Sequence, residues 1–204
     1  MLSQIRPAIV LLALFTLLTG LAYPMAITGV AQLVAPFQAN GSLLPVGGAP
    51  VGSALIGQNF ASDKYFHSRP SATQAQDPAY PDDSTKTIDA PYNAANSTGS
   101  NLGPTSQKLI DRVKADVDAK RAAGWTGPIP ADSVTTSASG LDPHISPEYA
   151  FAQIAAVAKA RNLPEDKVRA VVEANIQGRF LGLIGEPRVN VLRLNMALDA
   201  LKAS

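Results

Sequence analysis

The sequence predicts an α+β protein: a single N-terminal transmembrane helix, then one mixed extramembrane domain with a helical C-terminal half. Residues 7–62 contain no charged side chain. Residues 71–106 are rich in Pro, Gly, Ser and Asx and show no sustained period of 2 or 3.6. Beyond them, apolar residues return at helical spacing. We therefore divide the chain into an N-terminal tail (1–6), a membrane anchor (7–34) and an extramembrane domain (35–204).

The anchor is long enough to cross a bilayer. Residues 7–34 form an uncharged run of 28 residues, and about 20 apolar residues span the hydrocarbon core. A cleaved signal peptide is the alternative, because a basic start and the small residues Gly20 and Ala22 fit a cleavage site. The apolar run continues to Val34, which favours a retained anchor. Pro24 is expected to kink or loosen the helix.

The charges near the anchor predict its orientation. Arg6 is the only charged side chain before Asp63, so the positive-inside rule places the N-terminus in the cytoplasm and the main domain outside, in the periplasm. Ala13, Thr16 and Gly20 form a stripe of small residues on which another membrane helix could pack.

The first part of the domain is expected to be irregular. Residues 35–53 read as a Pro/Gly-punctuated connector, and residues 54–60 and 64–70 as short strands or turns. A structureless segment as long as 71–106 is uncommon in a compact domain. We expect it to be an ordered loop docked on the domain through its scattered apolar residues, which are Tyr80, Ile88, Tyr92 and Leu102.

Helices follow in the C-terminal half. Residues 106–124 place Leu109, Val113 and Val117 on one face. Ser146 is an N-cap followed by Pro147 at the first helical position, and it starts a helix over 146–162. Two more helices are expected over 164–178, with Val168, Val171, Val172 and Ile176 apolar, and over 190–204, capped by Asn190. Residues 132–139 and 179–188 are expected to be extended.

The residues do not indicate an enzyme. Metal-protease, phosphate-loop and nucleophile-elbow motifs are missing from the sequence. Without Arg6 the chain carries 16 basic and 16 acidic residues, so no nucleic-acid partner is indicated. A metal site would require the fold to bring His67 and His144 together. An anchored or secreted periplasmic enzyme using His144 beside Asp142 remains the alternative, although we expect these two residues to brace a turn.

Four blocks of the sequence together resemble a known family. They are GSALIGQNFASDKYFHSRPSA, SNLGPTSQKL, SASGLDPHISPEYAFAQIAAVAKAR and GEPRVNVLRLNMAL. In this order, after a single anchor, they resemble the C subunit of the Kdp-type potassium-transporting P-type ATPase over essentially the whole chain. The resemblance implies an accessory, non-catalytic subunit of the bacterial inner membrane. Its partners would be the potassium-conducting and ATP-hydrolysing subunits, and its role assembly and stability of the complex.

The resemblance also implies functional residues. The family is credited with raising the ATP affinity of the hydrolysing subunit, so LIGQ would make Gln58 a nucleotide contact. The expected orientation places Gln58 away from cytoplasmic ATP, so direct contact stays open. No firmly bound cofactor is expected, and ATP would come through the partner. The docking surface on the partner would include Tyr65, His67, Arg69, Asp142, His144, Arg179 and Arg188, with Asp142 also able to attract cations.

Overall fold

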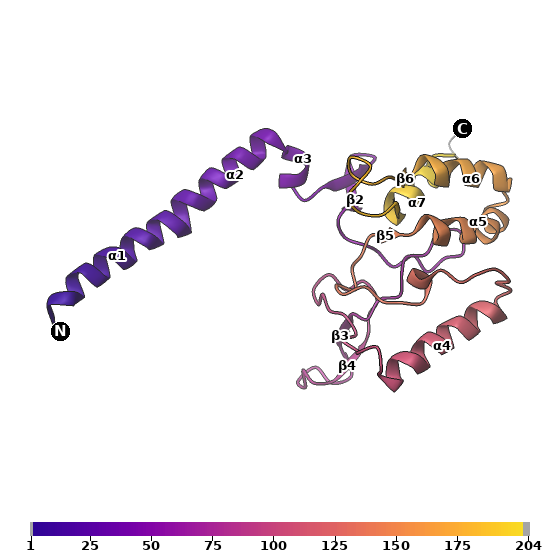
Figure 1. Ribbon diagram of the computed structural model, residues 1–204, viewed down its shortest axis with the longest axis horizontal. Helices are drawn as coiled ribbons and strands as arrows, with labels where there is room; N and C mark the ends of the chain where they lie inside the picture. Colours follow the sequence, from indigo (N-terminus) through magenta and orange to yellow (C-terminus); the bar gives the residue numbers. More distant parts are fainter. Residues whose placement is uncertain (1, 202–204) are drawn as a thin grey trace. The chain divides into compact units, whose positions relative to one another are not determined.

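The computed structural model describes residues 2–201 and resolves into two compact units (Figure 1). The first unit ends at Ser53 and the second begins at Ala54. The described residues are mixed helix and strand, and the helices concentrate in the C-terminal half. The predicted fold class is confirmed. The last three residues of the helix expected over 190–204 lie outside the described residues.

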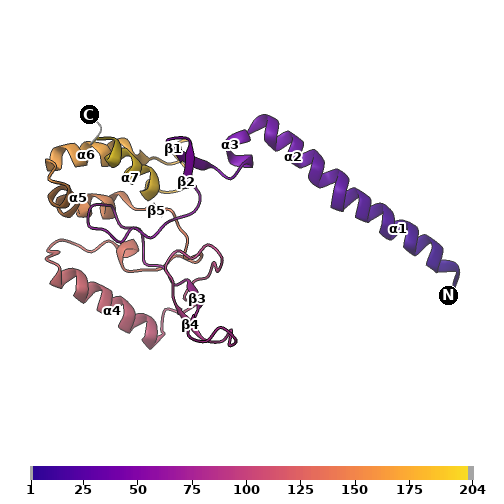
Figure 2. The ribbon, with the colours of Figure 1, turned by 180° about the vertical axis from the view of Figure 1, so that it is seen from behind.

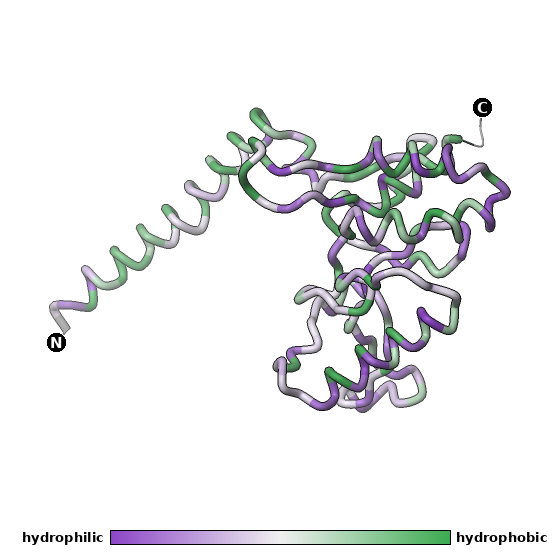
Figure 3. Tube along the Cα trace, turned by 45° about the vertical axis from the view of Figure 1, so that its right-hand side comes forward, coloured by the Kyte–Doolittle hydropathy of each residue, from purple (hydrophilic) through white to green (hydrophobic). Residues whose placement is uncertain are grey.

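The first unit opens with one long apolar helix. A short 3₁₀ turn, η1 (Leu2–Gln4), leads into α1 (Ile5–Leu17), the π-helical turn η2 (Leu18–Ala22) and α2 (Tyr23–Val34). Together Ile5–Val34 make 30 residues, and an 18-residue window within them reaches a mean hydropathy of 2.0. Figure 3 shows the apolar colour running along this helix. By length and composition it can cross a membrane.

The π-helical turn has a local cause. Pro24 has no backbone N–H to donate, and its ring crowds the carbonyl of Gly20 one turn earlier. The backbone N–H of Tyr23 donates to Leu18 O, five residues back, which widens the turn before the proline. The expected loosening at Pro24 is therefore confirmed as a π turn.

The connector after the helix is more regular than expected. It contains a short helix, α3 (Pro36–Ala39), and an antiparallel hairpin of β1 (Leu43–Val46) and β2 (Ala49–Ser53). Gly47 and Gly48 form the turn with φ of 59° and 87°. Two consecutive positive φ values are characteristic of the type I′ turn, which forms two-residue hairpin loops. Gly-Gly is a known sequence signal for this turn.

In the second unit, capping fixes where the helices start. The hydroxyl of Ser146 accepts a hydrogen bond from the backbone N–H of Tyr149 at the start of α5 (Pro147–Arg161), and Asn190 does the same for Arg193 at the start of α7 (Val191–Ala200). Both predicted caps are confirmed. Between them, α6 (Glu165–Ala174) ends four residues before Gly178, because Ile176 and Gln177 form a strand instead.

The strands of this unit are short. β5 (His144–Ile145), β7 (Arg188–Asn190) and β6 (Ile176–Gln177) form a three-stranded antiparallel sheet in that order. A separate ribbon pairs β3 (Gln74–Gln76) with β4 (Thr87–Asp89). In Figures 1 and 2, α5, α6 and α7 gather at one end of this unit, and α4 (Gln107–Ala122) lies with the ribbon at the other.

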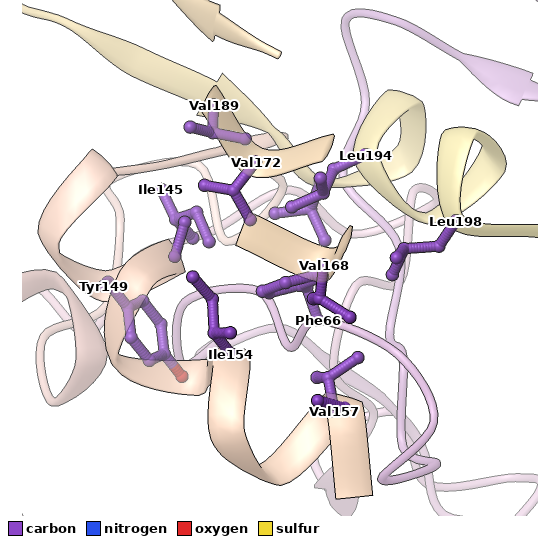
Figure 4. Close-up of a cluster of buried hydrophobic side chains, with 13 residues drawn as sticks. Phe66, Ile145, Tyr149, Ile154, Val157, Val168, Val172, Val189, Leu194 and Leu198 are labelled. Carbon is purple, nitrogen blue, oxygen red and sulfur yellow. The ribbon is translucent and has the colours of Figure 1, made fainter. Parts of the chain in front are cut away.

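The core lies between the sheet and the three C-terminal helices (Figure 4). Strands, helices and the irregular segment near Phe66 all contribute to it. Its fully or nearly fully buried members are Phe66, Ile145, Tyr149, Ala150, Ile154, Val157, Ala158, Val168, Val172, Val189, Val191, Leu194 and Leu198.

The expectations for the irregular parts were met in part. Residues 54–70, expected to be short strands or turns, contain turns and no strand in the described structure. Residues 132–139, expected to be extended, begin inside the 3₁₀ turn η3 (Ala131–Ser133) and continue mostly as turn and bends. Residues 179–187, also expected to be extended, form a loop with a bridge between Phe180 and Ile184 before β7 begins at Arg188. Helix α4 forms as predicted, but none of its residues is buried, so its apolar face is only half-covered. Tyr80 and Ile88, expected to dock the 71–106 loop, are exposed.

Candidate functional site

The segment around Phe66 has no regular secondary structure, yet its backbone is fully engaged by two helices. The amide of Asn195 in α7 accepts from Phe66 N at 2.9 Å and donates to Phe66 O at 3.0 Å. The amide of Gln153 in α5 does the same for the next residue, accepting from His67 N at 2.7 Å and donating to His67 O at 3.2 Å. These pairs satisfy buried backbone groups that would otherwise be costly.

A buried arginine fixes the start of the same segment. Arg161, at the end of α5, donates to Lys64 O and to the carboxylate of Asp199, the latter at 2.9 Å. Its guanidinium lies 4.8 Å from the ring centroid of Tyr65, and the Tyr65 hydroxyl donates to Asp199 at 3.2 Å. Tyr65, a predicted docking residue, is thus part of a polar cluster with Arg161 and the exposed Asp199.

The structure brings Arg69, Asp142 and His144 together, as their assignment to one surface requires. Arg69 Nη1 lies 3.0 Å from Asp142 Oδ2, and the remaining guanidinium donors face the carbonyls of Thr135 and Thr136 at 3.4 Å. Asp142 Oδ1 accepts from the backbone N–H of His144 at 3.0 Å and lies 3.6 Å from its ring Nδ1. Asp142 and His144 therefore brace the turn, as predicted.

The environment of Asp142 favours its ionised form. Burial alone would raise the pKa of this carboxyl, but hydrogen bonds from His144 and the Arg69 guanidinium outweigh burial and hold the pKa below its ordinary value. The cluster borders an open depression of about 590 Å³, whose lining includes Arg69, Asp142, His144, Glu186 and Arg188. With Asp132 and Glu148, which also line it, four acidic side chains and two arginines face the same hollow.

The loop 71–106 docks through small polar side chains. The hydroxyl of Ser71 donates to Gly140 O at 2.8 Å and accepts from Tyr92 N at 3.1 Å. Gly140 has a φ of +66°, and a Cβ there would lie 2.5 Å from Thr73 Cγ2. The hydroxyl of Tyr92 donates to Arg69 O at 2.9 Å, and burial raises the pKa of Tyr92 to about 12. Of the four predicted apolar docking residues, Tyr92 makes the clearest contact.

Gln58, the candidate nucleotide contact, is partly buried beside this docking point. The backbone carbonyl of Gln58 accepts from the Ser68 hydroxyl at 3.1 Å. The preceding Gly57 donates its N–H to Leu141 O at 2.8 Å, and a Cβ on Gly57 would lie 2.6 Å from Asp142 O. The LIGQ stretch thus contacts the Asp142 turn, and its glycine is required by close packing.

The groups that resemble a catalytic arrangement are engaged elsewhere. Ser139 accepts from Leu141 N at 3.1 Å, and Ser146 both donates to Asp132 at 3.0 Å and caps α5. His67 Nδ1 lies 2.6 Å from Phe60 O, so this nitrogen carries the proton. Within residues 2–201, no three His, Asp or Glu side chains are grouped to hold a metal ion.

The β6–β7 hairpin carries a feature that the sequence reading missed. Arg179 pairs with Glu186 at 2.6 Å, and Arg188 Nε lies 3.4 Å from Gln177 Oε1. Between the members of the ion pair, the loop presents four exposed large apolar side chains, which are Phe180, Leu181, Leu183 and Ile184. The sequence does indicate this loop, because a pair of large apolar residues stands on each side of Gly182, within a stretch bounded by Gly178 and Gly185.

A set of buried polar residues was also missed from the sequence alone, whereas the stripe on the membrane helix was predicted. Gln153, Arg161 and Asn195 are polar residues on the buried faces of α5 and α7, and this pattern was visible in the helical spacing. The predicted packing stripe of Ala13, Thr16 and Gly20 lies on the exposed apolar helix, with Gly20 inside the π turn.

Comparison with known proteins gives a consistent result over the whole chain. A family model described as K+-transporting ATPase, c chain (KdpC) matches residues 5–200. The potassium-transporting ATPase KdpC subunit of Bradyrhizobium diazoefficiens is 63% identical over 199 residues, covering 98% of each chain. The subunit of the same name from Rhodopseudomonas palustris strain BisB18 is 61% identical over 202 residues, covering 99% of this chain and all of the relative.

Proposed function

This chain belongs to the KdpC family, the c chain of K+-transporting ATPases, and from that premise we propose that it is an accessory, non-catalytic subunit. Its role is the assembly and stability of an ATP-driven potassium-uptake complex. Its partners are the subunits that conduct potassium and hydrolyse ATP. The anchor is retained in the mature protein.

The observation that supports this proposal is that the polar side chains that resemble a catalytic site are bound to neighbouring groups of the domain itself. Arg69 and Asp142 bond to each other and to neighbouring backbone groups, and Ser146 caps a helix. Groups held in this way keep a surface in one shape, and they are poorly placed to exchange protons with a substrate. This supports a shaped docking surface around the Asp142 depression, which is lined by Arg69, Asp142, His144 and Arg188. In this proposal the surface extends to the other predicted docking residues, Tyr65, His67 and Arg179, which do not line the depression.

Co-purification and uptake test the subunit role. In cells that express the whole complex, removal of residues 7–34 should abolish both ATP-driven potassium uptake and co-purification of this chain with the larger subunits. A matched variant carries an unrelated transmembrane helix in place of 7–34. If that variant restores membrane attachment but not co-purification, the anchor contributes specific contacts. Normal uptake without the chain would refute the accessory role.

The orientation is tested with a single cysteine. The native chain has none, and Ser84 is an exposed residue in the turn between β3 and β4. We propose that the domain is periplasmic, so Ser84→Cys should react with a membrane-impermeant maleimide in intact spheroplasts. Labelling that requires lysis of the spheroplasts would place the domain in the cytoplasm and reverse the proposed orientation.

The effect on ATP is indirect in this proposal. Removing the chain from the purified complex should raise the KM for ATP in the ATPase assay, whereas Gln58→Ala in the intact complex should leave that KM unchanged. A raised KM in the Gln58→Ala complex, with assembly intact, would instead indicate a direct nucleotide contact. Together with labelling of Ser84→Cys from the cytoplasmic side, that result would favour direct binding of ATP by this chain.

A further inference from the structure

The tip of the β6–β7 hairpin exposes an unusual amount of apolar surface. The exposed fractions are 68% for Phe180, 78% for Leu181, 82% for Leu183 and 65% for Ile184. Single exposed apolar residues are ordinary in soluble domains, but a contiguous group of large ones marks an interaction site. We call Phe180–Ile184 the apolar tip.

The backbone of the apolar tip is mostly satisfied within the loop. Phe180 N donates to Ile184 O at 2.8 Å, and Ile184 N donates back to Phe180 O at 3.0 Å. Leu183 N donates to Phe180 O and Gly182 N to Arg179 O, both at 3.1 Å. Four of the five backbone N–H groups therefore have partners inside the loop. These internal hydrogen bonds lower the cost of moving the tip from bulk water into an interfacial layer, because unpaired polar groups are costly there.

Charged groups surround the base of the apolar tip and not its end. Arg179 and Glu186 form an ion pair at 2.6 Å across the loop, and Arg188 follows at the start of β7. An apolar end above a polar collar is the arrangement of segments that lie at a membrane interface, where apolar side chains reach about 5–10 Å below the headgroups. Arginine at the collar can bind lipid phosphates.

The chain that carries this hairpin also carries the candidate membrane helix. In the first unit, Gln32 in the last turns of the membrane helix pairs with Asn40 at 3.0 Å, and the Ser53 hydroxyl donates to Gly41 O at 2.7 Å. In the second unit, Ala54 O accepts from the Asn190 amide, in the strand that leaves the loop, at 2.9 Å. Residues 35–53 join the membrane helix to Ala54, so the chain that carries the hairpin has its own candidate membrane anchor.

From these observations we propose that the apolar tip inserts into the interfacial layer of the lipid bilayer that holds the chain's own membrane helix. The occupant is lipid and not a protein groove, because a lipid surface accepts a protruding tip without a complementary pocket, and the same chain carries a helix that can anchor it in a bilayer. The inference goes beyond the proposed subunit role and does not depend on it, since the chain alone can be tested.

A fluorescent probe at the tip tests the proposal. Leu183→Cys in the full chain is labelled with an environment-sensitive dye and reconstituted into phosphatidylcholine vesicles, with and without phosphatidylglycerol. Ser84→Cys is the matched control, an exposed turn position on the β3–β4 ribbon. In both vesicle types we expect blue-shifted emission at position 183, and several-fold stronger quenching by spin labels on the upper acyl chain than at position 84.

Three results would overturn the proposal. The first is quenching at position 183 no stronger than at position 84. The second is a shift without acyl-chain quenching, because it would mean headgroup attraction alone. The third is a shift that appears only after the other ATPase subunits are added and that lipid labels do not quench, because it would indicate a protein groove. A second variant, Leu181→Asp in the labelled chain, should lower the lipid quenching several-fold.

Discussion

The side-chain amide of Asn195 pairs with both backbone polar groups of Phe66, a residue 129 positions earlier in the sequence. The two hydrogen bonds lie in the core, where Phe66 is fully buried and Asn195 nearly so. Together with the equivalent pair between Gln153 and His67, they fix the irregular segment that leads to Arg69. The shape of the candidate docking surface therefore depends on two amides that never reach that surface.

Asn195→Asp should destabilise the domain although the two side chains have the same shape. The substitution keeps an acceptor for Phe66 N but places a carboxylate oxygen against Phe66 O, leaving buried groups unpaired at a cost of about 1–3 kcal/mol or more. Thermal unfolding followed by Trp125 fluorescence measures the loss. Asn59→Asp, at an exposed position, is the control, and equal melting temperatures for both variants would contradict the pairing.

Gly140→Ala should detach the 71–106 loop. The φ of +66° strains an L-residue, and its Cβ would lie 2.5 Å from Thr73 Cγ2 and 2.7 Å from Thr98 O, so we expect a loss of about 2–4 kcal/mol. Limited proteolysis should then cut within 71–106. Gly103→Ala is the control, because a Cβ there meets no atom within 4 Å. If both variants resist proteolysis equally, the 71–106 loop does not depend on close packing at Gly140.

Acid should weaken the Asp142 cluster. The pKa of Asp142 is lower in the folded chain than its ordinary value of 3.8. The charged group therefore stabilises the fold above pH 3.8, and this contribution is lost as the pH falls through the folded pKa. Asp142→Asn should remove this step and cost about 1 kcal/mol at neutral pH. Urea unfolding from pH 7 to pH 3 measures it, with Asp82→Asn, at an exposed position, as the control.

High pH should destabilise the fold through ionisation of Tyr92. Burial raises its pKa from 10.0 to about 12, so the folded chain keeps a proton that the unfolded chain loses. Stability from this group is complete below pH 10 and is lost as the pH rises through about 12. Absorbance titration at the phenolate band should show a tyrosine that titrates near pH 12 and disappears in Tyr92→Phe, whereas Tyr149, whose pKa burial raises further, should titrate later still in both chains. A Tyr92→Phe chain with the same alkaline unfolding profile as the native chain would contradict this assignment.

The stripe of small residues on the membrane helix gives a prediction about assembly. If Ala13, Thr16 and Gly20 face a helix of another subunit, Gly20→Leu should reduce co-purification of the complex severalfold by preventing close approach. Gly29→Leu is a matched control, because both glycines are exposed on the same helix and a Cβ at either meets no neighbouring atom. Equal recovery of the complex with both variants would remove the stripe as a packing face.

Local signals predicted the parts of the fold that depend on neighbours in sequence. The caps at Ser146 and Asn190, the long apolar helix and the loosening at Pro24 all follow from side chains within one helical turn. The brace between Asp142 and His144 was predicted for the same reason, since an aspartate commonly accepts from the backbone two residues later.

Features that require distant partners could not be derived in this way. The strand at His144–Ile145 exists because Val189 and Asn190 lie beside it, and two residues carry no periodicity. The helix expected to continue to Gly178 ends early because Ile176 pairs with Val189 in the sheet. The ion pair between Arg69 and Asp142 joins residues 73 positions apart, so only their shared assignment to one surface was predicted.

The amide pairs at Phe66 and His67 have a consequence for how the domain opens. In each pair a side-chain amide from a helix binds the backbone N–H and C=O groups, as the backbone of a neighbouring strand would in a sheet. These two N–H groups are therefore protected although they belong to no sheet. In hydrogen exchange they should behave as members of the core, exchanging only when α5 and α7 separate from the segment. The slowest-exchanging unit of this protein would then include a stretch of irregular chain.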